Sequence, residues 1–213
     1  NYKVGVHIAD VSHYVKTGTS IDKEASVRGN SVYLVGKAIP MLPEKLSNNI
    51  CSLVPNEDRL TFSVVFEMTE KGNLVNHQIA KTIINSKRRF TYEEAQKIIE
   101  SGEGDFSNEV ILLNELAKHI RSKRMKTGSF EFFTPEVEFQ LDENGFLLNI
   151  LKKEMKESIM LVEAFMLLAN KTIAESVAKI KINKKPVPFP YRVHDQPDEE
   201  KLLPFIDFAR KYG

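Results

Sequence analysis

Runs of apolar, aromatic and β-branched residues mark the expected strands of this chain. Such runs cover residues 4–9, 60–68 and 74–86, and the polar residues 71–73 between the last two predict a β-hairpin. A second hairpin is expected from residues 132–141 and 146–151, because the Asn-Gly pair at 144–145 favours a tight reversal. The pattern therefore predicts antiparallel pairing.

A helical period of three to four residues appears elsewhere in the chain. It predicts short helices over residues 21–27 and 205–211, and a longer one from Ser107 to about Arg124. Thr91 and Glu94 form a capping-box pattern at the start of another helix. The longest helix is expected over residues 157–179, with a buried stripe at Ile159, Val162, Met166, Ala169, Ile173, Val177 and Ile180. The fold class that follows is α+β, with mainly antiparallel sheets and packed helices.

Residues 28–53 have an unusual composition. Residues 31–35 are β-branched enough for a short strand, but Pro40 and Pro43 force their predecessors into extended conformations and remove two backbone donors. Apolar residues on such a constrained loop suggest the wall of a site. The polar residues 47–49 are expected to form a turn between two buried anchors.

Composition narrows the class of protein. The 213 residues are 42% hydrophobic, enough for a sizeable core, and no run approaches a membrane span. The single cysteine, Cys51, excludes an internal disulfide framework and fits the cytoplasm. With 30 basic against 29 acidic residues, a nucleic-acid site would have to be a local patch. The candidates are residues 87–89, 118–126 and 179–185, although such runs are usually solvated faces.

Several long sequence blocks occur in an order that resembles a known family. They are HIADVSHYV at 7–15, IDKEASVRGNSVYL at 21–34, IPMLPEKLSNNICSL at 39–53, FFTPEVEFQLDENG at 132–145, LVEAFMLLAN at 161–170 and YRVHDQPDEEKL at 191–202. These blocks resemble the catalytic (RNB-type) domain of the ribonuclease R and ribonuclease II family, ribonuclease R more closely. Both ends look cut from a longer chain, so residues 1–213 are expected to form one partial catalytic domain.

The resemblance assigns RNA-binding roles to three residues. Tyr33 and Phe132 match aromatic residues that clamp the last bases of RNA, although Phe130 and Phe133 are close neighbours of Phe132. Glu163 matches a residue that contacts the RNA 3′ end. Their alternatives are a tyrosine on a sheet face and a glutamate at a helix edge that reaches solvent. Glu163 also lies among apolar neighbours, which predicts that its carboxylate meets a partner, a metal or a substrate.

Five other polar residues lie in the matching blocks, but the resemblance assigns them no step in RNA binding or hydrolysis. They are His7, Arg28, Asn48, Arg192 and His194. The second glutamate that the family usually has after Glu163 is Ala164 here, which puts a paired role in doubt.

The implied chemistry is magnesium-dependent hydrolysis of RNA from 3′ to 5′, releasing nucleoside 5′-monophosphates. In the family, the aspartates that bind Mg²⁺ form a cluster just before the strand that is residues 3–9 here, so no catalytic ligand is expected within this chain. The partners implied are single-stranded or structured RNA and flanking OB-fold domains, with no membrane. One alternative is a nuclease-dead RNA-binding or scaffolding module of the same fold. An unrelated α/β metabolic enzyme is weaker, because it predicts a nucleotide-binding glycine loop and the sequence has none.

Overall fold

The computed structural model describes residues 1–129, 136–193, 195–196 and 198–212. Its contacts divide the chain into two compact units, Asn1–Ile173 and Ala174–Gly213. The boundary between the units falls within the longest helix, α5 (Glu157–Ala178).

A three-stranded antiparallel sheet forms the centre of the first unit. Its order is β1 (Tyr2–Ala9), β4 (Asp58–Met68) and β5 (Leu74–Asn85). The predicted hairpin is confirmed, with Thr61 opposite Thr82 and a register shift between Glu67 and Met68. β1 pairs along its whole length with the other edge of β4.

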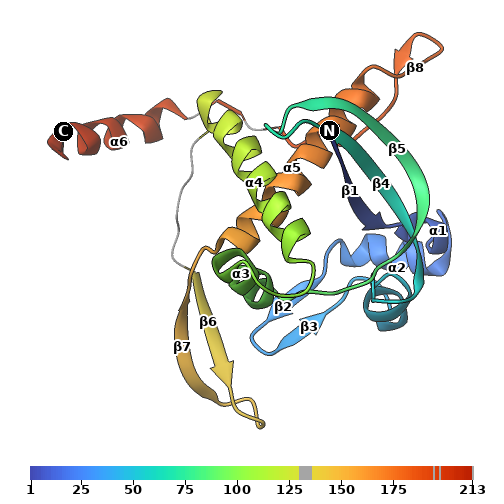
Figure 1. The fold of residues 1–213 in the computed structure, drawn as a ribbon, viewed down its shortest axis with the longest axis horizontal. Helices are drawn as coiled ribbons and strands as arrows, with labels where there is room; N and C mark the ends of the chain where they lie inside the picture. The colour runs from blue at the N-terminus through green and yellow to red at the C-terminus, as the bar shows by residue number, and fades with distance from the viewer. Residues whose placement is uncertain (130–135, 194, 197, 213) are drawn as a thin grey trace. The chain divides into compact units, whose positions relative to one another are not determined.

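Alternation along these strands produces one strongly apolar face. Val4 and Val6 of β1 and Val64, Phe66 and Met68 of β4 are buried on it. Leu116 and Ala117 of α4 (Ser107–Lys126) and Ala164, Phe165 and Ala169 of α5 pack against these strands. Figure 1 shows α4 and the first part of α5 on this side of the sheet. The expected α+β class, with packed helices and antiparallel sheets, is therefore confirmed.

The remaining short elements follow local sequence signals. α1 (Val11–Tyr14) follows β1, and Thr19 caps α2 (Ser20–Arg28). Thr91 and Glu94 form the predicted capping box at the start of α3 (Tyr92–Ser101), and Gly102 ends this helix in the left-handed conformation.

Two further hairpins complete the first unit. β2 (Val32–Leu34) pairs with β3 (Lys37–Ile39), and β6 (Glu136–Leu141) pairs with β7 (Leu147–Lys153). The segment between β3 and β4 differs from the expected polar turn. Lys45–Ile50 form one π-helical turn without a fully buried residue.

The second unit contains the end of α5, the short hairpin of β8 (Lys181–Ile182) and β9 (Lys185–Pro186), and α6 (Glu199–Tyr212). The helix expected from residue 205 begins six residues earlier. The Asp198 side chain accepts a hydrogen bond from the Glu200 backbone N–H at 3.0 Å, which starts the helix upstream of Pro204.

The buried stripe expected on α5 was wrong in part. Val162 and Met166 are 42% and 36% exposed, whereas Ser158, Phe165 and Thr172 are buried. The inward face instead follows Ser158, Leu161, Ala164, Phe165, Leu168, Ala169 and Thr172. Both stripes have helical spacing, so the choice between them depends on where the sheet lies.

Candidate nucleic-acid interface

Tyr33 lies on the β2–β3 hairpin and presents its ring to solvent. It pairs in register with Ala38, and its exposed fraction is 80%. The hairpin turns at Gly36, whose φ of +72° favours glycine. A Cβ added there would lie 2.7 Å from Cδ1 of Leu141, so the turn of this hairpin approaches β6 closely. The ring of Tyr33 is therefore accessible for stacking on a base.

The loop after this hairpin is held by two side chains. The Ser31 hydroxyl accepts a hydrogen bond from the Met41 backbone N–H at 2.9 Å. The Arg28 guanidinium donates to the Pro40 carbonyl at 3.3 Å and pairs with Glu24 at 2.9 Å. Arg28 thus links α2 to the proline-rich loop and stabilises the loop's position. Asn48 lies exposed on the π-helical turn.

Glu163 lies at the edge of α5 and not in its buried face. Its side chain is 47% exposed, and Oε1 lies 3.3 Å from Nη2 of Arg124 on α4. Of the two alternatives, the structure agrees with a glutamate at the helix edge that reaches solvent, because successive residues on a helix point about 100° apart and Glu163 falls beside the buried face. The partner that the sequence predicted for this carboxylate is present, and it is the partly exposed Arg124 guanidinium.

The other residues of the matching blocks have varied surroundings. Phe132 and His194 lie outside the described residues, and Arg192 is exposed. His7 Nδ1 lies 2.7 Å from the Ser63 hydroxyl, and burial lowers the pKa of this imidazole. The Ser63 hydroxyl also hydrogen-bonds to the Thr82 hydroxyl at 2.6 Å, and the Thr82 hydroxyl hydrogen-bonds to that of Thr61 at 2.7 Å. These contacts give His7 a structural role between strands.

The basic run at 118–126 is largely engaged within the protein. Lys118 pairs with Glu115 and Glu157, each at 3.3 Å. The Lys123 ammonium donates to the Lys71 and Gly72 carbonyls at 3.0 and 2.8 Å, which holds the β4–β5 turn against α4. Lys118 and Lys123 of this run are therefore not free to bind phosphates.

A cavity of about 600 Å³ lies beside the basic run at 87–89, and the sequence analysis missed it. Phe90 and Phe106 line it together with residues of α3, α4 and the first turns of α5, including Val162, which precedes Glu163. Ser158 also lines it, and its buried hydroxyl has no hydrogen-bond partner among the described residues. The run from Lys87 to Tyr92 places three cations beside two aromatic residues, which is the signal that points to this site.

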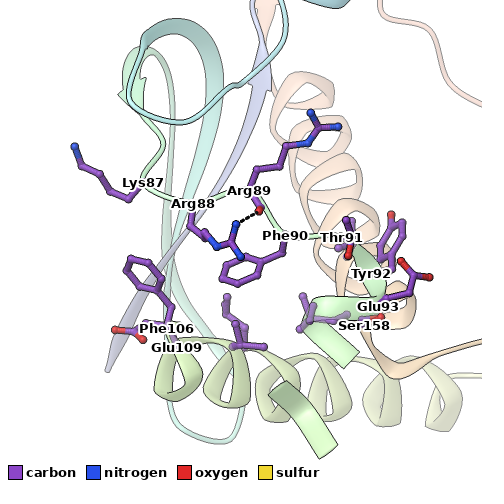
Figure 2. A pocket seen from close by; sticks show the side chains of 15 residues that line it. Lys87, Arg88, Arg89, Phe90, Thr91, Tyr92, Glu93, Phe106, Glu109 and Ser158 are labelled. Carbon is purple, nitrogen blue, oxygen red and sulfur yellow. Dashed lines mark hydrogen bonds between the residues drawn. The ribbon is translucent and has the colours of Figure 1, made fainter. Parts of the chain in front are cut away.

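Charge around this cavity is partly neutralised. The Arg88 guanidinium lies 5.0 Å from the centre of the Phe90 ring and pairs with Glu94 at 3.1 Å and Asp105 at 3.3 Å. The charged ends of Lys87 and Arg89 point away from the Phe90 ring (Figure 2). The cavity thus combines aromatic surface, a buried hydroxyl and cations at its edge.

Carboxylates in the described part of the chain do not suit a magnesium site. No three His, Cys, Asp or Glu side chains converge there. Asp10 is buried, but its carboxylate already pairs with Lys81 at 2.9 Å and accepts from the Ser12 hydroxyl at 2.5 Å. The Ser12 hydroxyl and the Lys81 ammonium lower the pKa of Asp10.

Among the described helices, none has the length and apolar character needed to cross a membrane.

Comparisons with known proteins agree along the chain. A family model described as the RNB domain matches residues 1–212. Ribonuclease R 1 of Lactococcus lactis is 40% identical over 219 residues, which cover 100% of this chain and 26% of the relative. The chain thus spans about a quarter of the length of this curated relative.

Solved structures of RNase R from Mycoplasma genitalium have the same fold. The complex with ribose-methylated single-stranded RNA gives a TM-score of 0.89 at 31% identity, covering 98% of this chain and 33% of that one. The complex with double-stranded RNA gives 0.88 at 31% identity, covering 98% and 37%.

Proposed function

The chain belongs to the RNB domain family, and from this membership we propose that it is part of the catalytic domain of a ribonuclease R-like 3′-to-5′ exoribonuclease. The parent enzyme hydrolyses RNA to nucleoside 5′-monophosphates in the cytoplasm. The observation that carries the proposal is the match over residues 1–212, supported by 31% identity to an RNase R solved with RNA. We further propose that residues 1–213 form one partial catalytic domain, flanked by OB-fold domains in the parent.

The proposed roles of the candidate residues follow from their chemistry. The exposed ring of Tyr33 stacks on a base near the scissile bond. Phe132, which lies outside the described residues, is proposed from the family resemblance as the second aromatic residue of the clamp. Stacking accepts any base, which suits a nuclease without sequence preference. The surface carboxylate of Glu163 accepts a hydrogen bond from a ribose hydroxyl at the RNA 3′ end.

Magnesium would supply the activated water and stabilise the leaving oxygen. The described residues of this chain do not fit such a site, so no hydrolytic step is assigned to them. We propose that the ligands come from outside these 213 residues. Within the chain, the candidate residues bind and orient the RNA.

The test uses the full-length parent protein with magnesium and a 5′-labelled single-stranded RNA. The proposal predicts a ladder that shortens from the 3′ end and nucleoside 5′-monophosphates as products. RNA binding without products would instead support a nuclease-dead module. Internal cuts, or no interaction with RNA, would refute the proposal.

A further inference from the structure

One ion pair joins the two long helices beside the candidate site. Nη2 of Arg124, near the end of α4, lies 3.3 Å from Oε1 of Glu163 on α5, although 39 residues separate them. The Arg124 side chain is 29% exposed and that of Glu163 is 47% exposed. The cation is therefore the better buried member of the pair, and the carboxylate is the more accessible one.

The backbone of Arg124 is also held at the end of α4. Its carbonyl accepts hydrogen bonds from the Thr127 backbone N–H at 3.1 Å and from the Thr127 hydroxyl at 2.8 Å. This places the guanidinium on a fixed part of the helix. By contrast, Lys118 and Lys123 of the same run contact other carboxylates and the β4–β5 turn.

We propose that Arg124 is a positioning residue for Glu163 in RNA binding, an inference that rests on the proposed function. A lone carboxylate beside an RNA backbone is repelled by the phosphates even in water. The guanidinium neutralises this charge and fixes one carboxylate oxygen through its planar donors. Because Arg124 contacts Oε1, the other carboxylate oxygen, Oε2, is the one that accepts a hydrogen bond from the ribose hydroxyl.

This arrangement makes an asymmetric prediction for a double-mutant cycle. In the parent enzyme, Arg124→Ala leaves the carboxylate uncompensated, so KM for RNA rises about two- to fivefold, as expected for an exposed ion pair. Preference for a 3′-terminal ribose over deoxyribose falls, because Glu163 is no longer oriented. Glu163→Ala removes the same preference because the carboxylate itself is lost, and it leaves no unpaired charge to repel the phosphates. The double variant therefore recovers a KM near that of Glu163→Ala, with no further loss of preference.

Two further variants separate positioning from general stability. Arg124→Lys restores the charge and should recover KM. Lys156→Ala breaks a comparable surface pair with Glu93, at 3.5 Å and 34% and 67% exposed, and should leave KM and ribose preference unchanged.

The experiment measures kcat, KM and melting temperature for wild type and all variants on RNA with a ribose or deoxyribose 3′ end. Additive losses of preference in the double variant would overturn the inference. A changed melting temperature for Arg124→Ala with unchanged KM and preference would overturn it too. If the wild-type protein binds RNA without cleaving it, the proposed function fails, and the same cycle is then measured as Kd. Absence of any RNA binding overturns both.

Discussion

Replacing Tyr33 with alanine in the parent enzyme should separate RNA positioning from folding. The ring is 80% exposed on a short hairpin, so the protein depends little on it. The binding of an RNA base that stacks on the Tyr33 ring depends on the ring directly. The expected result is slower cleavage or a longer final product, with a loss of stability of no more than about 1 kcal/mol.

The magnitudes follow from exposure. A fully buried aromatic side chain removes about 150–250 Å² from water, so Tyr33 buries roughly 30–50 Å². At about 25 cal/mol per Å², the cost of Tyr33→Ala is about 1 kcal/mol. Loss of one stacked base costs about 1–3 kcal/mol, or roughly 5- to 150-fold in binding of the RNA end. The effect on function should thus equal or exceed the effect on folding.

The assay combines urea denaturation with single-turnover cleavage of a labelled RNA resolved to single nucleotides. Tyr33→Phe retains the ring and should behave as wild type. Phe66→Ala, at a fully buried position, should cost about 3–5 kcal/mol and calibrates a true core loss. A loss of that size for Tyr33→Ala, with an unaltered product length, would show that the ring belongs to the core.

Three further predictions follow. Glu163→Ala should change the free energy of unfolding by less than about 1 kcal/mol, because its pair with Arg124 is partly exposed; a loss of several kcal/mol in urea denaturation would make the pair structural. The Thr91 backbone N–H lowers the pKa of Glu94 in the folded state, so its contribution to α3 is complete above the ordinary value of about 4.3 and is lost as pH falls through the lower folded pKa. Hydrogen exchange in α3 from about pH 3 to 6 checks this, and Glu94→Gln should weaken the pH dependence but leave the part that comes from Glu93, whose pKa is also lowered; an unchanged profile in the Glu94→Gln variant would contradict the cause. Finally, the 213-residue chain alone with magnesium should release no mononucleotides from labelled poly(A), and their release would show that it carries a complete catalytic centre.

Local signals in the sequence predicted most elements of the fold. The capping box at Thr91, the strands of the β4–β5 hairpin and the extent of α5 all appear where expected. These features depend on contacts between residues within a few positions of one another, which sequence patterns encode directly. The roles of Tyr33, Phe132 and Glu163 came from the family resemblance and stay predictions.

The tertiary structure decided which residues from distant parts of the sequence contact one another and which stay exposed. The sequence left open whether Glu163 meets a partner among its apolar neighbours or reaches solvent at the helix edge. Because the sheet packs on the face that carries Phe165, Glu163 reaches the surface and meets Arg124. The cavity beside Phe90 likewise needs residues from α3, α4 and α5 to come together. A periodic pattern determines that a helix has an apolar side, and several stripes of α5 satisfy it. Only the position of the packed sheet selects one of them, and with it which side chains remain free for a ligand.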